Sequence, residues 1–148
     1  MVRAKRALEY AARGKRRPCA ETVLGALDVL RRAKPCPPNS ESFSGTWELV
    51  FTSSLAPVPL IRGYMPTREL LVWDLEAKAL HLEVYSLPWV PPIRIRGGGL
   101  EYSEAEGMLT YCVGDKPPST WEVFHADGGV IAALSSATGT NIIRRVPP

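Results

Sequence analysis

Hydrophobic residues recur at helical spacing before residue 35 and at every second position after residue 43. We predict a short helix over residues 2–13 and a second, amphipathic helix over residues 20–34. Pro35 ends the second helix, and residues 35–42 form a Pro-rich polar linker. The apolar positions that share a stripe on these helices are Ala4, Leu8, Ala11, Ala12, Val23, Leu24, Leu27 and Leu30.

A two-residue alternation of apolar and polar positions begins in residues 46–53. Trp47, Leu49 and Phe51 share one face of this strand, and we expect that face to point inward. Gly97–Gly99 is expected to form a bend or bulge, and Gly, Pro and Asp mark the other turns. The later predicted strands are 68–75, 79–87, 93–97, 99–104, 108–113, 120–126, 129–134 and 141–146.

This run of short strands with no helix between them favours an antiparallel barrel or sandwich. We prefer the closed barrel, because closure removes unpaired strand edges and about eight strands enclose room for one small ligand. The prediction is a mainly β fold, with two short N-terminal helices before the barrel. Residues 1–38 form the basic helical segment with its linker, and residues 39–148 form one compact barrel domain.

Charge is distributed unevenly along the chain. Residues 1–38 hold ten Lys and Arg against three acidic residues, whereas the remainder holds eight basic and twelve acidic residues. Such a basic segment meets anionic lipid or an acidic partner, or is simply a solvated helical face. Nucleic-acid binding is not expected, because Tyr10 is the only aromatic residue in the basic segment and no nucleic-acid motif accompanies it.

Several other classes of protein are disfavoured by composition. The three cysteines, Cys19, Cys36 and Cys112, have neither the number nor the spacing of a disulfide framework or a zinc site. The isolated His81 and His125 indicate neither a metal site nor catalysis. No apolar run has the length of a transmembrane helix. The Arg- and Ala-rich start fits either the end of a transit peptide or a mature helix.

Gly45, Thr46 and Trp47 open the first predicted strand. A Gly-x-Trp in this position resembles the lipocalins, in which the Trp closes one end of the barrel and an Arg from the last strand packs on its indole. Arg144 and Arg145 lie on the last predicted strand and are the candidates for that cation–π contact.

The longer segment 44–54 resembles the corresponding strand of the plastid lipid-associated proteins, also called plastid fibrillins. The helical leader, residues 59–66, and the ending 121–145 are similar to further parts of that family. One departure is that Asp127 is followed by Gly128 and Gly129, where many members carry an Arg-Gly pair. Any ligand or partner role of that Arg is then lost or moved to Arg144 or Arg145.

The resemblance implies a lipocalin-like barrel in the plastid, at thylakoids or plastoglobules. It implies an apolar ligand such as a lipid, quinone, tocopherol or carotenoid. We expect no catalytic cofactor and no metal. The residues that we expect to contact the ligand are Trp47, Leu49, Phe51, Trp73, Tyr85, Trp89, Arg144 and Arg145.

Two Pro-rich apolar loops, residues 57–66 and 86–93, are expected at the mouth of the cavity as a lid, a membrane contact or a partner surface, or as tight corners. The first hypothesis for function is a carrier of an apolar metabolite. The second is a structural accessory subunit of a photosynthetic membrane complex. The third, an enzyme, ranks last and requires a carboxylate or His such as Glu48, Glu83 or His81 to face inward.

Overall fold

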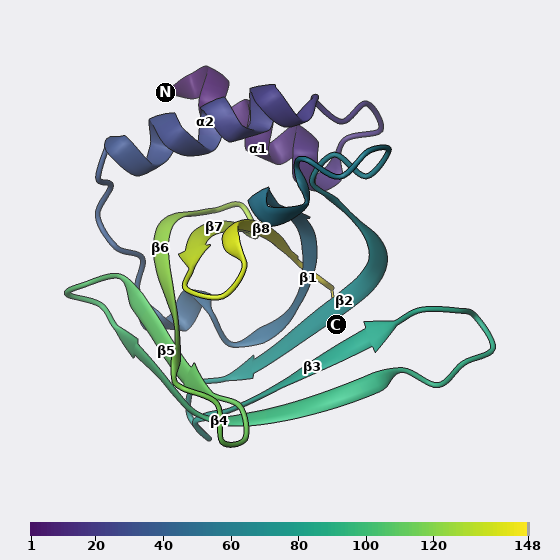
Figure 1. Cartoon of the computed structure of the whole chain (residues 1–148). Helices are drawn as coiled ribbons and strands as arrows, with labels where there is room; N and C mark the ends of the chain where they lie inside the picture. Colours follow the sequence, from purple (N-terminus) through teal and green to yellow (C-terminus); the bar gives the residue numbers. More distant parts are fainter. Residues whose placement is uncertain (148) are drawn as a thin grey trace.

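A computed structural model describes residues 1–147, so that Pro148 of the predicted barrel segment lies outside the described residues. Eight antiparallel strands close into a barrel in which each strand pairs with its neighbours in sequence and β8 pairs with β1 (Figure 1). The mainly β prediction is therefore confirmed. The elements are α1 (Val2–Arg13), α2 (Ala20–Arg32), β1 (Gly45–Thr52), β2 (Tyr64–Asp74), β3 (Ala79–Tyr85), β4 (Ile93–Ser103), β5 (Met108–Cys112), β6 (Ser119–Asp127), β7 (Val130–Ser135) and β8 (Gly139–Arg145), with 3-10 turns η1 (Ser40–Ser42) and η2 (Ser53–Leu55).

The predicted strands 93–97 and 99–104 are one strand, β4, which corrects the sequence-based prediction. Gly99 has φ +64 and lies where the pairing of β4 with β5 shifts, between Gly98 and Glu101. The glycines were expected to make a bend or bulge, and they do so without ending the strand, because pairing resumes on both sides.

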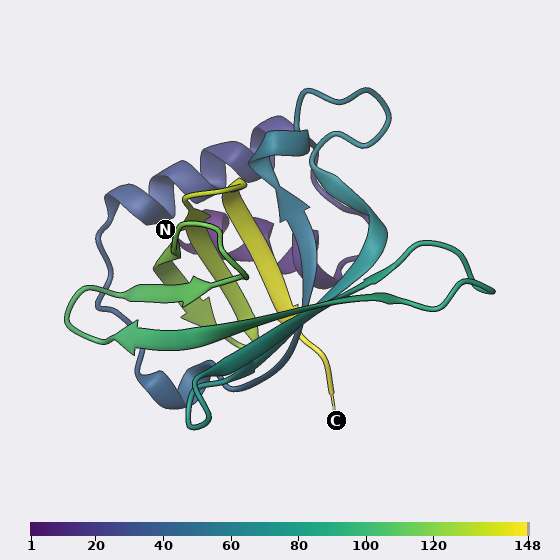
Figure 2. The same cartoon turned by 60° about the horizontal axis from the view of Figure 1, so that its bottom comes forward.

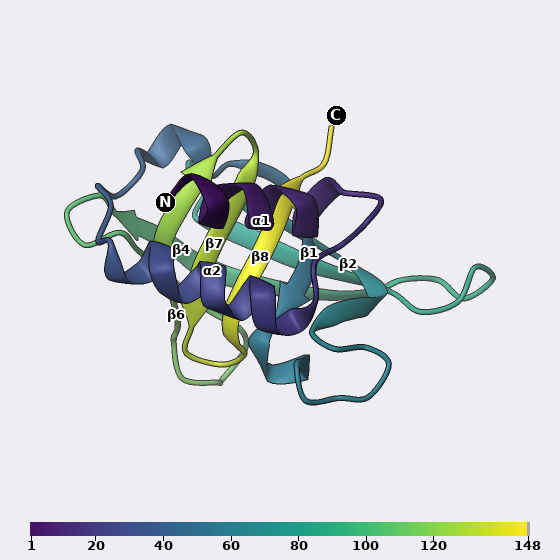
Figure 3. The ribbon, with the colours of Figure 1, turned by 90° about the horizontal axis from the view of Figure 1, so that it is seen from above.

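Two apolar cores lie on opposite sides of the barrel wall. The outer core joins α1 and α2 to the outward residues of β1, β6, β7 and β8, among them Val50, Phe124 and Ile142. Figure 3 shows both helices lying across these strands. The inner core lies inside the barrel and includes Trp47 and Trp121. Burial of the helical stripes against the wall thus makes the helices part of the folded body. Within residues 1–147, no helix has the length and apolar character needed to cross a bilayer.

Arg144 fastens α1 to the barrel. Its guanidinium donates to Glu48 Oε2 from Nε at 3.0 Å and from Nη2 at 2.8 Å, and to the Ala12 carbonyl from Nη1 at 2.9 Å. The Ala12 carbonyl belongs to the last turn of α1, where the helix itself leaves acceptors without partners. Arg144 therefore has a structural role on the outside of the barrel.

The up-and-down strand order gives the barrel two different ends. The connections β1–β2, β3–β4, β5–β6 and β7–β8 lie at one end, which we call the mouth. The start of β1, the end of β8 and the remaining turns lie at the other, which we call the closed end. The β3–β4 hairpin reaches beyond the other strands at the mouth, and we call its tip, residues 85–93, the arm (Figure 2).

Candidate binding site in the barrel mouth

Directly paired residues on neighbouring strands point to the same side of a sheet. Leu71, Leu82 and Ile95 are paired across β2, β3 and β4, and Leu71 belongs to the inner core. The row next to it towards the mouth consists of Glu69, Val84 and Ile93. Both rows therefore face the interior of the barrel.

These inward rows are open to solvent at the mouth. Ile95 is 40% exposed and Ile93 is 60% exposed, although both lie on the inner face. Leu49, Leu82 and Val84 are also only partly buried. An inward apolar surface that remains accessible is the kind of surface on which an apolar ligand gains free energy by excluding water.

The closed end is filled by aromatic side chains. Trp47 and Trp73 lie 6.2 Å apart by ring centroid, Trp73 and Trp121 lie 5.6 Å apart edge to face, and all three are almost fully buried. Trp47 Nε1 donates to the Phe43 carbonyl at 2.8 Å. Arg145 covers the outer face of Trp47, with Cζ 4.4 Å from the ring centroid. This end of the barrel is therefore sealed by side chains.

Two buried polar atoms inside the barrel have no hydrogen-bond partner among the described residues, Trp121 Nε1 and Asn141 Oδ1. Asn141 uses its other amide atom, since Nδ2 donates to Thr138 Oγ1 at 2.8 Å. Asn141 pairs with Ala133 on β7, and Ala133 pairs with Val123 on β6, two positions from Trp121. A free donor and a free acceptor therefore lie on neighbouring rows of the inner wall, and buried polar groups of this kind are normally satisfied.

Glu69 is an inward carboxyl near the mouth. It pairs with Leu49 on one side and with Val84 on the other, and both neighbours are aliphatic. Burial alone raises the pKa of Glu69 above its ordinary value of 4.5. The inner wall therefore offers a protonatable carboxyl next to aliphatic side chains, which suits a ligand with a small polar group on an apolar body.

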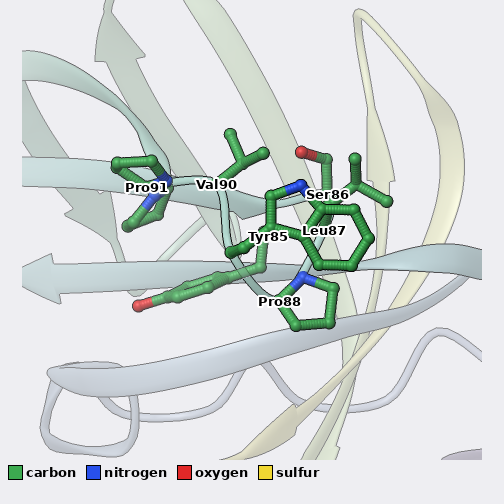
Figure 4. A pocket seen from close by; sticks show the side chains of 8 residues that line it. Tyr85, Ser86, Leu87, Pro88, Val90 and Pro91 are labelled. Atoms are coloured by element: carbon green, nitrogen blue, oxygen red, sulfur yellow. The ribbon is translucent and has the colours of Figure 1, made fainter.

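The arm contains a hollow of about 490 Å³ of its own (Figure 4). Tyr85, Ser86, Leu87, Pro88, Trp89, Val90, Pro91 and Pro92 line it. The Pro residues fix φ, so these side chains are held out at a low entropic cost of ordering.

The structure brings together only some of the predicted ligand-contacting residues. Leu49 lies on the inner wall near the mouth, whereas Trp47 and Trp73 belong to the aromatic packing of the closed end. Trp89 is at the tip of the arm. Of the two arginines proposed to stack on Trp47, Arg145 makes the contact and Arg144 does not.

The prediction that Phe51 shares a face with Trp47 and Leu49 is wrong. The pairing of β1 with both β2 and β8 shifts between Leu49 and Phe51, as in a β-bulge. Val50 and Phe51 consequently both belong to the outer core beneath the helices. Phe51 packs edge to face on Tyr64 with centroids 5.3 Å apart. One extra residue in a strand is sufficient to reverse the side-chain alternation.

The expectation that Tyr85 lines the cavity is also corrected. Leu80 and Leu82 face inward on β3, so the alternation turns His81, Glu83 and Tyr85 outward. The Tyr85 hydroxyl donates to Glu83 Oε2 at 2.8 Å, and this hydrogen bond lowers the pKa of Glu83 and raises that of Tyr85. Glu83 and His81, two of the possible catalytic groups, therefore face away from the lumen. The third, Glu48, is also outside the barrel, where it is paired with Arg144.

Glu69, Asn141, Trp121, Ile93 and Ile95 were not singled out from sequence. Glu69 is in phase with Leu71 and Trp73 in the alternation of β2, a signal that would have identified it. Ile93 and Ile95 alternate with Arg94 and Arg96 in the same way. Asn141 carries no such signal, because its burial depends on the register of β8 with β1 and β7.

Comparisons of the chain with protein-family models, with curated proteins and with solved structures found no match. What is established is the closed barrel of eight antiparallel strands, preceded by two helices, that is sealed at one end and lined with accessible aliphatic side chains at the other.

Proposed function

We propose that the barrel binds an apolar small molecule in its mouth and performs no chemistry on it. The observation that carries this proposal is the inward, solvent-accessible aliphatic surface of β3 and β4, centred on Ile93 and Ile95. Covering it with ligand removes apolar area from water, at about 25 cal/mol per Å² before ordering costs. The lipocalin-like arrangement of a sealed end and an open end supports the same function.

The ligand class and the location are part of the proposal. The resemblance to plastid lipid-associated proteins supports a lipid, quinone, tocopherol or carotenoid as the ligand, and thylakoids or plastoglobules as the location. The polar atoms of Asn141, Trp121 and Glu69 favour a ligand with one hydrogen-bonding group on an apolar body. A hydroxyl is suitable, because one hydroxyl group can both donate to an acceptor such as Asn141 Oδ1 and accept from a donor such as Trp121 Nε1.

The test is retention of ligand by the purified protein. The chain is incubated separately with α-tocopherol, a short-chain plastoquinone and a fatty acid, excess ligand is removed, and bound ligand is counted by native mass spectrometry. We expect one molecule per chain with at least one of them. Retention of none rejects the proposal.

A matched pair of substitutions locates the site. Ile95→Gln puts an amide on the inner face, whereas Arg96→Gln puts the same side chain on the adjacent outward position. We expect Ile95→Gln to weaken binding about tenfold, because it removes the apolar area of one side chain, and Arg96→Gln to leave it within about twofold. Equal effects of the two substitutions would exclude the inner face as the site.

The structural alternative, an accessory subunit of a photosynthetic membrane complex, is supported by the filled closed half of the barrel and by the exposed arm. It predicts no retained ligand in the same experiment. It also predicts that the chain migrates with a solubilised thylakoid complex on gel filtration, and that Trp89→Ser abolishes this.

A further inference from the structure

Apolar side chains project from two separate loops at the mouth. On the arm, Trp89 is 78% exposed, with Leu87 and Ile93 beside it. On the β1–β2 loop, Leu60 is fully exposed and sits at φ +70. Figures 1 and 2 show both loops projecting on the same side of the molecule. Exposure of several large apolar side chains at one end marks a contact with another apolar phase.

A basic cluster lies beside the β1–β2 loop. The α1–α2 connection carries Lys15, Arg16 and Arg17, all exposed. The Tyr64 hydroxyl donates to the Pro18 carbonyl at 2.7 Å, and Arg17 Cζ lies 4.9 Å from the centroid of the Tyr64 ring. These two contacts hold the α1–α2 connection against the start of β2. In Figure 3 the α1–α2 connection, the β1–β2 loop and the arm all lie on the right-hand side.

The strands next to the arm add further basic side chains. Arg68, Arg94 and Arg96 are exposed on β2 and β4. Arg94 Nε lies 3.4 Å from Glu83 Oε1, so part of the charge of Arg94 is compensated. Arg68 Cζ lies 5.8 Å from the centroid of the Tyr85 ring. Arg68, Arg94 and Arg96 thus lie behind the apolar tip of the arm, between that tip and the body of the barrel.

The opposite end of the barrel is acidic. Its turns and the η1 turn before β1 carry six exposed carboxylates, which outnumber the exposed basic side chains of Lys78 and Arg145 at the same end. The six are Glu41, Asp74, Glu76, Glu104, Glu106 and Asp127. Charge of opposite sign at the two ends gives the molecule a dipole along the barrel. An anionic surface attracts the mouth and repels the closed end, which orients the protein before contact.

We propose that the mouth docks on an anionic lipid bilayer. Trp89, Leu87 and Leu60 enter the interfacial region, and Lys15, Arg16 and Arg17 meet the lipid headgroups. Apolar tips in front of a basic layer match the order of a bilayer, in which the hydrocarbon lies below charged headgroups. Trp is well suited to this depth, since its ring is amphipathic.

Docking deepens the proposed function, because the aliphatic inner face of the mouth opens towards the membrane and an apolar ligand passes between them without crossing water. This consequence rests on ligand binding, but docking itself does not. Vesicle binding is therefore measured without added ligand and ligand retention without vesicles, so failure of one is distinguishable from failure of the other.

The assay uses the full chain with vesicles of phosphatidylcholine alone and of phosphatidylcholine with a quarter phosphatidylglycerol. Trp47, Trp73 and Trp121 are buried, so a blue shift of tryptophan emission on vesicle addition reports Trp89. We expect the shift, and co-sedimentation, with the anionic vesicles. Binding should weaken with added salt, because headgroup attraction is screened.

Three variants are compared with the wild type. Trp89→Ser should weaken vesicle binding about tenfold, because the largest inserted apolar side chain is removed. Replacing Lys15, Arg16 and Arg17 together by Gln should weaken it by at least tenfold, since each basic residue near the surface contributes about 1 kcal/mol. Val29→Ser, an exposed apolar position on α2, is the matched control and should leave binding unchanged.

If the chain does not bind anionic vesicles that contain no other protein, the proposal is overturned. The apolar tips would then be a surface for a protein partner. Equal loss in Trp89→Ser and Val29→Ser also overturns it, since docking would not then depend on the mouth. Binding that is equal on neutral and anionic vesicles overturns the role of the basic cluster.

Discussion

The guanidinium of Arg145, near the end of the chain, lies over the indole of Trp47, near the start of the barrel, with Cζ 4.4 Å from the ring centroid. Arg145 Nη1 donates to the Ser44 carbonyl at 3.0 Å and Nη2 donates to the Ser42 carbonyl at 2.7 Å. One side chain therefore joins β8 to the segment that enters β1 and closes this end of the barrel.

Replacing Arg145 by Ala should lower the free energy of unfolding by about 1–2 kcal/mol, since an exposed cation–π contact and two hydrogen bonds are lost. Arg145→Lys should recover only part of this, because Lys lacks the planar fork that reaches both carbonyls. Urea unfolding of the variants measures the effect.

Arg3→Ala, which removes an exposed Arg from α1, is the charge-matched control for Arg145 and should unfold like the wild type. A loss in Arg145→Ala no larger than in Arg3→Ala would contradict a role in closing the barrel.

The contact between Arg145 and Trp47 could be predicted from sequence, because the two residues lie on the last and the first strand, which pair in a closed barrel whatever the register of the strands between them. The helices and most strands could be predicted for a similar reason, since each rests on local periodicity. Gly14 ends α1 as expected, and its N–H donates to the Tyr10 carbonyl at 2.8 Å.

The bulge at Leu49–Phe51 was not predicted. Three consecutive apolar residues, Leu49, Val50 and Phe51, interrupt the alternation there, but such a run does not show which of them changes face. Val50 and Phe51 face the helices only because α1 and α2 cover that part of the wall with apolar residues. Tertiary packing decides the face there. The positions of the candidate site residues were accordingly predicted in part: Leu49 lies on the inner face and the arm lies at the mouth, as expected, but Phe51 and Tyr85 were placed on the wrong face.

Gly63 should be among the least replaceable glycines of the mouth. It has φ +93, and a Cβ built on it would stand 2.6 Å from Phe51 Cζ. Gly63→Ala should therefore cost about 2–4 kcal/mol, from backbone strain together with displacement of the Phe51 ring. Thermal or urea unfolding measures this loss.

Gly128→Ala is the matched control for Gly63. Gly128 has φ +58, and a Cβ there meets nothing within 4 Å, so only the backbone strain of about 1 kcal/mol is expected. Similar losses in the two variants would show that the Phe51 ring moves aside without cost.

Asn141→Leu should affect stability and binding in opposite directions. The substitution removes the unpartnered Oδ1 but also the hydrogen bond to Thr138, so the ligand-free protein should be unchanged or up to about 2 kcal/mol more stable. Binding of α-tocopherol, whose hydroxyl would donate to Oδ1, should weaken about tenfold. Binding of β-carotene, a hydrocarbon, should be unaffected.

Thr138→Val separates the two contributions of Asn141, since it removes the hydrogen bond and leaves Oδ1 unpartnered. It should destabilise the protein by about 1 kcal/mol. If Asn141→Leu destabilises the ligand-free protein as much as Thr138→Val does, burial of Asn141 Oδ1 without a hydrogen-bond partner costs no free energy. The hypothesis that Oδ1 binds a ligand hydroxyl then loses its basis.

Glu69 should make stability fall as the pH rises from about 4.5 towards neutrality. Burial raises its pKa in the folded protein above the ordinary value of 4.5, so the folded state keeps the proton at pH values where the unfolded state has released it. The unfolded state then binds fewer protons, and stability declines with pH across that window.

Glu69→Gln cannot lose a proton, so its melting temperature should exceed that of the wild type by more at pH 7 than at pH 4. Glu76→Gln, at an exposed carboxyl of the closed end, is the control. A difference between Glu69→Gln and wild type that is the same at both pH values would mean that the carboxyl reaches water in the folded protein, and that the inner wall at the mouth is more polar than its aliphatic neighbours Leu49 and Val84 imply.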